Sequence, residues 1–178
     1  MNINSTKNKY WYVVYTRSRA EKKVSDELIR KGIECFLPLR KRLRQWKDRK
    51  KWVEMPLMPG YCFVHISSHE YDKVLQTNHV VCYVTFEGKA AVIPEWQIES
   101  LKQMLKQQVF DVEVTHESFT PGKMVEIIEG PLVGVQGELL AIRGKNKFVL
   151  RLEQINTIFT IEVPASYLSF LPKEMVKN

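Results

Sequence analysis

Histidine and cysteine are the residue types of this chain best suited to binding a metal or to catalysis, and their spacing supports neither role. His65 and His69 are four residues apart, but the end of a predicted strand falls between them, so the two side chains do not share a helical face. His79 and His116 have no potential ligands nearby in the sequence. The chain also has no Gly-rich phosphate loop, nucleophile elbow or Cys-x-x-Cys pair. We therefore expect no metal, no cofactor and no catalytic site, so that the protein is not an enzyme.

The cysteines and the apolar runs indicate where the chain works. Cys35, Cys62 and Cys82 are odd in number and widely spaced, which fits neither a disulfide framework nor a zinc ribbon and favours a reducing cytoplasm. No apolar run is long enough to span a membrane, and the first residues lack the apolar segment of a signal peptide. We expect a cytoplasmic protein with no membrane partner.

Positive charge is the strongest chemical signal, and it is confined to the first part of the chain. Residues 1–60 hold 16 Lys and Arg against 6 Asp and Glu, whereas residues 61–178 hold 11 against 14. Eight of these basic residues lie in residues 39–51, where Asp48 is the one acid, so we expect an exposed loop or hairpin tip there. Trp46 and Trp52 interrupt this segment and could either pack across strands or stack on a base. The asymmetry predicts a polyanionic partner for the first part.

The elements that position these charges read as an α+β unit, an antiparallel sheet with flanking helices. The most secure helix covers residues 19–32, where Ala20, Val24 and Leu28 form one apolar stripe and Ser18 could cap the start together with Glu21. The other expected elements are strands at 11–16, 33–37, 61–66 and 80–86, a short helix at 70–76 and a helix that starts at Pro94.

The pattern of the remaining residues is all β. We expect a first domain at 10–108, a linker at 109–121 and a second domain at 122–172. Five short strands at 123–129, 135–142, 147–152, 157–163 and 167–170 favour a small five-stranded SH3-like β-barrel. A Gly-Pro turn and further glycines mark its first corner, at Gly122, Gly130, Pro131, Gly134 and Gly137.

Two motifs give a family resemblance. The glycine spacing resembles a KOW motif, and the aromatic strand from Trp11, the basic helix and the Pro59-Gly60-Tyr61-x-Phe63-Val64 element resemble the amino-terminal (NGN) domain of the NusG family. The chain is therefore identified as a member of this family of transcription elongation and antitermination factors. The compact size and the basic hairpin favour a specialised paralogue of the UpxY or RfaH type.

The resemblance implies that the first domain binds RNA polymerase. An apolar cavity would grip the clamp helices of the largest subunit, lined by Tyr61 and Phe63, with Phe86 and Tyr15 beside them. Alternation along residues 61–66 means that either 61, 63 and 65 or 62, 64 and 66 pack beneath the helices. The plainer alternative is that Tyr61 and Phe63 are those helix-facing residues.

The resemblance also implies contacts with the non-template DNA strand at the upstream fork. Basic residues at the strand–helix junction (Arg17, Arg19, Lys22 and Lys23) would touch phosphates, and Thr77 with Asn78 matches a second contact. RfaH-like members carry a basic residue at the position of Asn78, which puts that contact in doubt.

The implied activity is suppression of pausing or termination, including at dedicated polysaccharide operons, by a monomer whose KOW domain binds ribosomal protein S10 or Rho. The rival function is that of a KOW-containing RNA-binding ribosomal or ribosome-assembly protein. That function calls for a basic barrel, whereas residues 122–171 hold five basic residues against five acidic ones.

Overall fold

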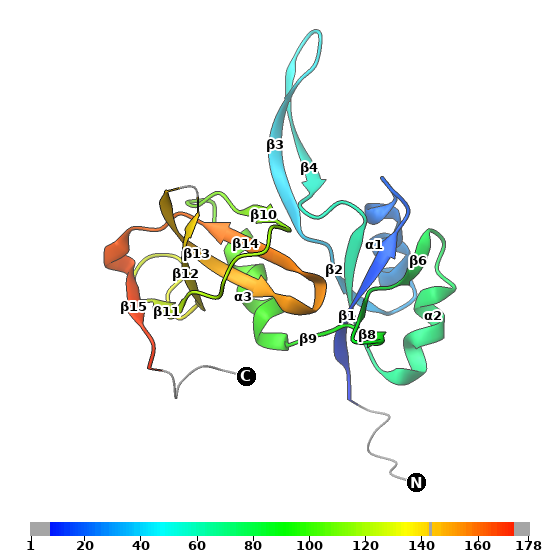
Figure 1. Ribbon diagram of the computed structural model, residues 1–178. Helices are drawn as coiled ribbons and strands as arrows, with labels where there is room; N and C mark the ends of the chain where they lie inside the picture. Colours follow the sequence, from blue (N-terminus) through cyan, green and yellow to red (C-terminus); the bar gives the residue numbers. More distant parts are fainter. Residues whose placement is uncertain (1–7, 143, 173–178) are drawn as a thin grey trace. The chain divides into compact units, whose positions relative to one another are not determined.

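The computed structural model describes residues 8–142 and 144–172, and their contacts divide them into two compact units (Figure 1). The first unit ends at Glu95 and the second begins at Trp96. The helix expected at the end of the first domain thus belongs, by its contacts, with the second unit. Each unit is described by itself.

The first unit is built on an antiparallel sheet with the strand order β2-β5-β1-β6, in which β9 also pairs with β1. Its elements are β1 (Tyr10–Thr16), α1 (Glu21–Arg30), β2 (Glu34–Phe36), β5 (Tyr61–Ile66), a 3-10 turn (Ser68–Glu70), α2 (Tyr71–Leu75), β6 (Val80–Tyr83) and β9 (Val92–Ile93). Strands and helices therefore follow the order that the sequence predicts.

The core of this unit lies between one face of the sheet and its two helices. Val14, Cys62 and Val64 from the sheet are buried against Val24 of α1 and Val74 of α2. Even-numbered residues of β1 and β5 thus face the helices, as the alternating pattern requires. The expected fold class, an antiparallel sheet with flanking helices, is confirmed.

The start of α1 differs from the expectation. The helix begins at Glu21, its N-cap residue is Ala20, and no side chain caps it, so Ser18 does not play the expected role. The chain between β1 and α1 instead turns through Arg19, whose φ of 63° is left-handed. The carboxylate of Glu21 accepts a hydrogen bond from the backbone N–H of Gly60.

Two hairpins extend this framework. The basic segment forms a long two-stranded ribbon of β3 (Leu39–Gln45) and β4 (Lys50–Pro56), which pairs with no other strand of the described chain and projects from the sheet (Figure 1). The expected strand 80–86 is interrupted at Val84, because β7 (Thr85–Phe86) turns back through Glu87 and Gly88 to pair with β8 (Lys89–Ala90). Both turn residues have positive φ, as a two-residue hairpin turn requires.

The second unit holds α3 (Glu95–Lys106) and a six-stranded antiparallel sheet of order β10-β14-β13-β12-β11-β15. Its strands and 3-10 turns are β10 (Glu113–Thr115), β11 (Lys123–Ile127), β12 (Gln136–Ile142), β13 (Lys145–Leu152), a turn at Glu153–Ile155, β14 (Thr157–Ile161), a turn at Ala165–Tyr167 and β15 (Leu168–Phe170). All five strands expected for the barrel are present. The residues expected as a linker contribute the sixth, because β10 pairs with β14.

No helix in the described residues is both long and apolar enough to span a membrane.

Candidate functional site

The face of the first sheet that points away from α1 and α2 carries a band of aromatic side chains. Odd-numbered residues of β1 and β5 share this face, and the register places them in pairs. The pairs are Trp11 with His65, Val13 with Phe63, and Tyr15 with Tyr61. The set 61, 63 and 65 is therefore not the set packed beneath the helices, and the plainer alternative is wrong.

Tyr15 and Tyr61 form the accessible end of this band. Their hydroxyl oxygens are 2.8 Å apart and hydrogen bonded, and their ring centroids are 4.6 Å apart. Tyr15 is 39% exposed and Tyr61 is half-buried. Burial, together with the hydrogen bond to Tyr15, raises the pKa of Tyr61 to about 12. The two rings thus hold each other in a fixed pose with apolar surface free for a partner.

Phe63 does not offer a free surface, which corrects the expectation that it lines an open cavity. Its side chain is 0% exposed and lies beside the Phe36 ring, with the centroids 5.9 Å apart. Val13 and Phe36 are its neighbours on the two flanking strands. Phe63 is therefore a buried packing residue of the aromatic band. Phe86 is 43% exposed on the separate β7–β8 hairpin.

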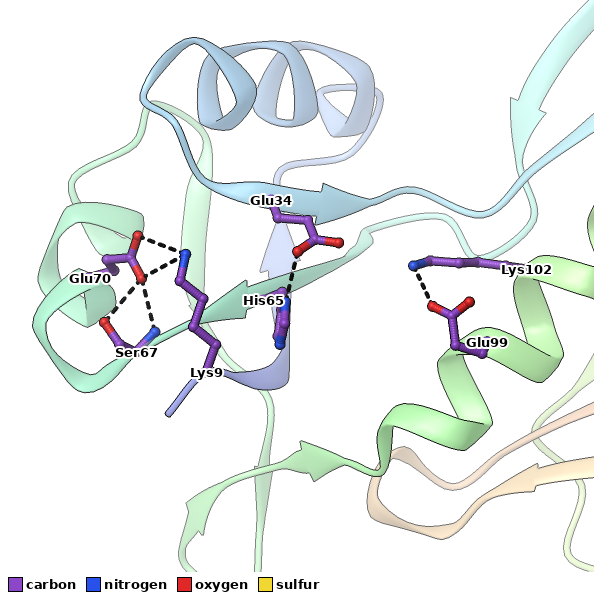
Figure 2. Close-up of polar contacts among 7 residues, drawn as sticks. All are labelled: Lys9, Glu34, His65, Ser67, Glu70, Glu99 and Lys102. Atoms are coloured by element: carbon purple, nitrogen blue, oxygen red, sulfur yellow. Dashed lines mark hydrogen bonds and ion pairs between the residues drawn. The ribbon is translucent and has the colours of Figure 1, made fainter. Parts of the chain in front are cut away.

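The buried end of the band contains a cluster that the sequence analysis missed. The ring of His65 stacks on that of Trp11 with the centroids 4.8 Å apart. His65 Nδ1 lies 2.7 Å from a carboxylate oxygen of Glu34 on the neighbouring strand β2 (Figure 2). Alternation placed His65 on this face, but its carboxylate partner depends on the register of β2.

The predicted nucleic-acid contacts gather at the β1–α1 junction. Arg17, Arg19, Lys22 and Lys23 are all exposed. The backbone N–H of Arg17 donates to His79 O at 2.8 Å, which ties this junction to the loop that precedes β6. The four cations therefore lie on one segment held against the neighbouring loop.

Glu21, also missed, fixes this end of the sheet. It is a buried carboxylate at the first position of α1, and its Oε1 accepts the Gly60 N–H at 2.8 Å. Thr16 N–H in turn donates to Gly60 O at 2.8 Å. Gly60 is thereby fixed from both sides, and it directly precedes Tyr61. The hydrogen bond from Gly60 to Glu21 thus links the β1–α1 junction to the pair of Tyr15 and Tyr61.

Thr77 is not placed to contact nucleic acid, which corrects that prediction. Its side chain is 2% exposed, accepts a hydrogen bond from Lys31 Nζ at 2.9 Å and donates one to Lys73 O at 3.0 Å. Asn78 is exposed, and its backbone N–H points to Glu27 Oε1 at 3.4 Å. A hydrogen bond from Lys31 lowers the pKa of Glu27, so this carboxylate stays ionised beside Asn78.

The glycines of the second unit allow close packing and turns of its backbone. A Cβ at Gly137 would lie 2.4 Å from Val149 O and 2.6 Å from Phe148 Cζ, so the position admits no side chain. Gly134 has open space around it, but its φ of +86° favours glycine. The other motif residues are Gly122, whose N–H donates to Glu138 Oε2 at 2.8 Å, and the turn residues Gly130 and Pro131 between β11 and β12.

The cations of the second unit are largely paired. Lys145 binds Glu162 at 3.1 Å, Lys147 binds Glu113, and Arg151 binds Glu138 at 2.7 Å. Arg151 and Glu138 are both mostly buried, and the hydrogen bond to Glu138 raises the pKa of Arg151. Within residues 96–142 and 144–172, these three cations thus do not form a free cationic surface.

Comparisons with known proteins agree with this architecture. The family model "Transcription termination factor nusG" matches residues 9–102, more than half of the 178 residues. The "Transcription termination/antitermination protein NusG" of Streptococcus pyogenes serotype M3 (strain MGAS315) is 22% identical over 168 residues, covering 88% of this chain and 94% of the relative. The same protein of serotype M1 matches equally well, with 22% identity over 168 residues. A solved structure described as "Domain interaction in Thermotoga maritima NusG" covers 94% of this chain and 99% of its own, with a TM-score of 0.52 and 22% sequence identity, and so shares the fold.

Proposed function

The chain belongs to the NusG family of transcription termination and antitermination factors, and from that premise we propose that its first unit binds the clamp helices of the RNA polymerase largest subunit. The binding surface would be the exposed end of the aromatic band. Phe86 would add a further aromatic contact.

The observation that carries this proposal is the pair of hydrogen-bonded tyrosines on the sheet face away from α1 and α2. Tyr15 and Tyr61 present apolar ring surface, and their mutual hydrogen bond fixes both hydroxyl groups. Aromatic anchors of this kind bury a large area and have few rotamers to freeze on binding. Phe63, which is fully buried, would not contact the partner directly.

The basic junction would contact the non-template DNA strand at the upstream fork. Arg17, Arg19, Lys22 and Lys23 are exposed on one segment, so they could reach phosphates together. Such contacts give salt-sensitive affinity and little sequence choice. Asn78, beside the ionised Glu27, would add at most a neutral contact.

The mechanism needs no chemical step. A factor that binds both the clamp and the annealed upstream DNA stabilises the closed, elongating state and lowers the population of paused states. We propose that this suppresses pausing or termination in the cytoplasm, at dedicated operons if the protein is a paralogue of the UpxY or RfaH type.

The second unit would recruit ribosomal protein S10 or Rho. Exposed apolar side chains on and beside β11 and β15 (Ile128, Val133 and Phe170) offer a surface for a protein partner. The paired cations Lys147 and Arg151 argue against the rival function of docking on ribosomal RNA.

Co-purification with core RNA polymerase tests the proposal. Replacing both anchors, Tyr15→Ala with Tyr61→Ala, should weaken binding by roughly 30-fold or more, because truncating an aromatic anchor in an interface costs about 2 kcal/mol or more. Tyr10→Ala is the matched control, since Tyr10 is an exposed tyrosine of the same strand with the opposite alternation. Equal recovery of polymerase by the double variant and by the control would refute the assigned surface.

A further inference from the structure

The β3–β4 ribbon has one strongly cationic face. Its register pairs Arg42 with Val53, Leu43 with Trp52, and Arg44 with Lys51. Because successive residues of a strand point to opposite faces, the even positions of β3 share a face with the odd positions of β4. We call this the cationic face; its charged members are Arg40, Arg42, Arg44, Arg49 and Lys51. The paired strands contribute no carboxylate to it, and the nearest acid in the sequence is Asp48 in the turn.

The opposite face of the ribbon has a different composition. Lys41 lies opposite Glu54, and Lys50 lies opposite Gln45. Trp52 and Leu43 occupy the space between them. This face is close to neutral and partly apolar, so charge along the ribbon is sorted by face and not spread evenly.

The charges of the cationic face are not neutralised by ion pairs with the part of the chain that the structure describes. No ion pair joins a basic residue of this ribbon to a carboxylate anywhere in residues 8–142 and 144–172. Arg42, Arg44, Arg49 and Lys51 are all exposed. In the second unit, by contrast, Lys147 and Arg151 are paired. Four close, unpaired cations on one face repel one another, and a polyanion would remove that repulsion.

A tryptophan stands at the end of the same face. Trp46 N–H donates to Arg49 O at 2.8 Å, which continues the pairing of the ribbon by one step and places Trp46 on the side of Arg44. The ring is 54% exposed. An exposed indole beside a row of cations can stack on an unpaired base while the cations hold the phosphates, whereas the bases of a duplex are not free to stack on it.

We propose that the cationic face binds single-stranded nucleic acid along its length, with Trp46 stacked on a base. A seven-residue strand is about 23 Å long, which accommodates a short run of nucleotides. This inference rests on the proposed function in one respect. A transcribing complex holds two unpaired strands, the non-template DNA and the nascent RNA. Because the proposed function assigns the non-template DNA to the β1–α1 junction, we assign the nascent RNA as the ligand of the ribbon.

Direct binding to the purified full-length protein tests the surface without polymerase. The probe is a fluorescent oligouridylate of about ten nucleotides, followed by anisotropy at several salt concentrations. With four phosphate contacts, the slope of log K against log salt should be about −2.8 for a single strand. A duplex of the same length that binds as tightly as the single strand would overturn the proposal, as would absence of binding.

Matched variants assign the face. Arg42→Gln with Arg44→Gln should weaken binding roughly tenfold at physiological salt and reduce the slope by about 1.4, because two phosphate contacts are lost. Lys41→Gln with Lys50→Gln removes the same charge from the opposite face and should change affinity by less than about threefold. Equal losses in the two double variants would show a response to net charge alone and overturn the assignment.

The stacking role is tested separately. Trp46→Ala should weaken binding between about 5-fold and 150-fold, since stacking of one base on an aromatic ring has about that effect. Trp46→Phe keeps an aromatic ring and should retain most of the affinity. A Trp46→Phe variant as weak as Trp46→Ala would overturn the stacking assignment.

A photo-crosslinking amino acid in place of Trp46 then identifies the strand in a stalled elongation complex. Crosslinks to labelled nascent RNA would support the assignment, and crosslinks to DNA alone would overturn it. If the factor fails to join the polymerase complex but still binds the oligonucleotide, the proposed function fails while the nucleic-acid surface stands.

Discussion

Replacing Glu21 by alanine should destabilise the first unit by about 3 kcal/mol. The buried carboxylate accepts the Gly60 N–H at 2.8 Å, and a hydrogen bond to a charged group contributes about 1.5–3 kcal/mol. A carboxylate in the first turn of a helix adds about 0.3–1 kcal/mol through the helix dipole. Glu21→Gln keeps an acceptor oxygen and should cost only about 1 kcal/mol. For a unit of this size, the larger loss lowers Tm by about 12–24 °C.

Hydrogen exchange of amides in β1 and β5 of the full-length protein measures this loss in the first unit alone. Glu27→Ala is the control, since Glu27 is a carboxylate of the same helix whose ion pair with Lys31 lies near the surface. Its loss should cost much less than the loss of Glu21, because an ion pair near the surface contributes little to stability. If Glu21→Ala were no more destabilising than Glu27→Ala, the contact with Gly60 would not hold the junction together.

Two further outcomes follow from the structure. The pKa of Tyr61 is raised from 10.0 to about 12, so between these pH values the folded state keeps a proton that the unfolded state has lost. The resulting contribution to the free energy of unfolding is complete below pH 10 and is lost as pH rises through about 12. Unfolding titrations of Tyr61→Phe should lack this pH dependence. Gly137→Ala should destabilise the second unit by at least about 2 kcal/mol, because the added Cβ would meet the backbone atom Val149 O. Gly134→Ala should cost only about 1 kcal/mol, because the site has open space and the cost comes from its positive φ alone. Urea unfolding that reverses this order would contradict the packing.

Periodicity predicted the sheet and helices well because each depends on local pattern. The apolar stripe of Val24 and Leu28 located α1, and the alternation along residues 61–66 separated the two faces of β5 correctly. Glycine spacing likewise located the first corner of the second sheet. These features are set mainly by residues that are close together in the sequence.

Solvent exposure and long-range partners could not be read in the same way. Phe63 has the same residue type and spacing whether its face is open or closed, so its burial depends on tertiary packing. Thr77 has a hydroxyl group that could bind a ligand, but in the folded protein this hydroxyl is hydrogen bonded to Lys31 Nζ and to Lys73 O. The position of Glu21 in the sequence is compatible with a local helix cap as well as with the contact to the distant Gly60 that the structure shows.

The ion pairs of β13 also limit how the strand can be misaligned. Lys145, Lys147 and Arg151 project to one side, where carboxylates on adjoining segments meet them. A slip of one residue would turn these cations toward the side of Phe148, which is buried. Charge therefore discriminates against the shifted alignment at three points, and this unit is protected from the strand slippage that leads small all-β domains to swap or aggregate.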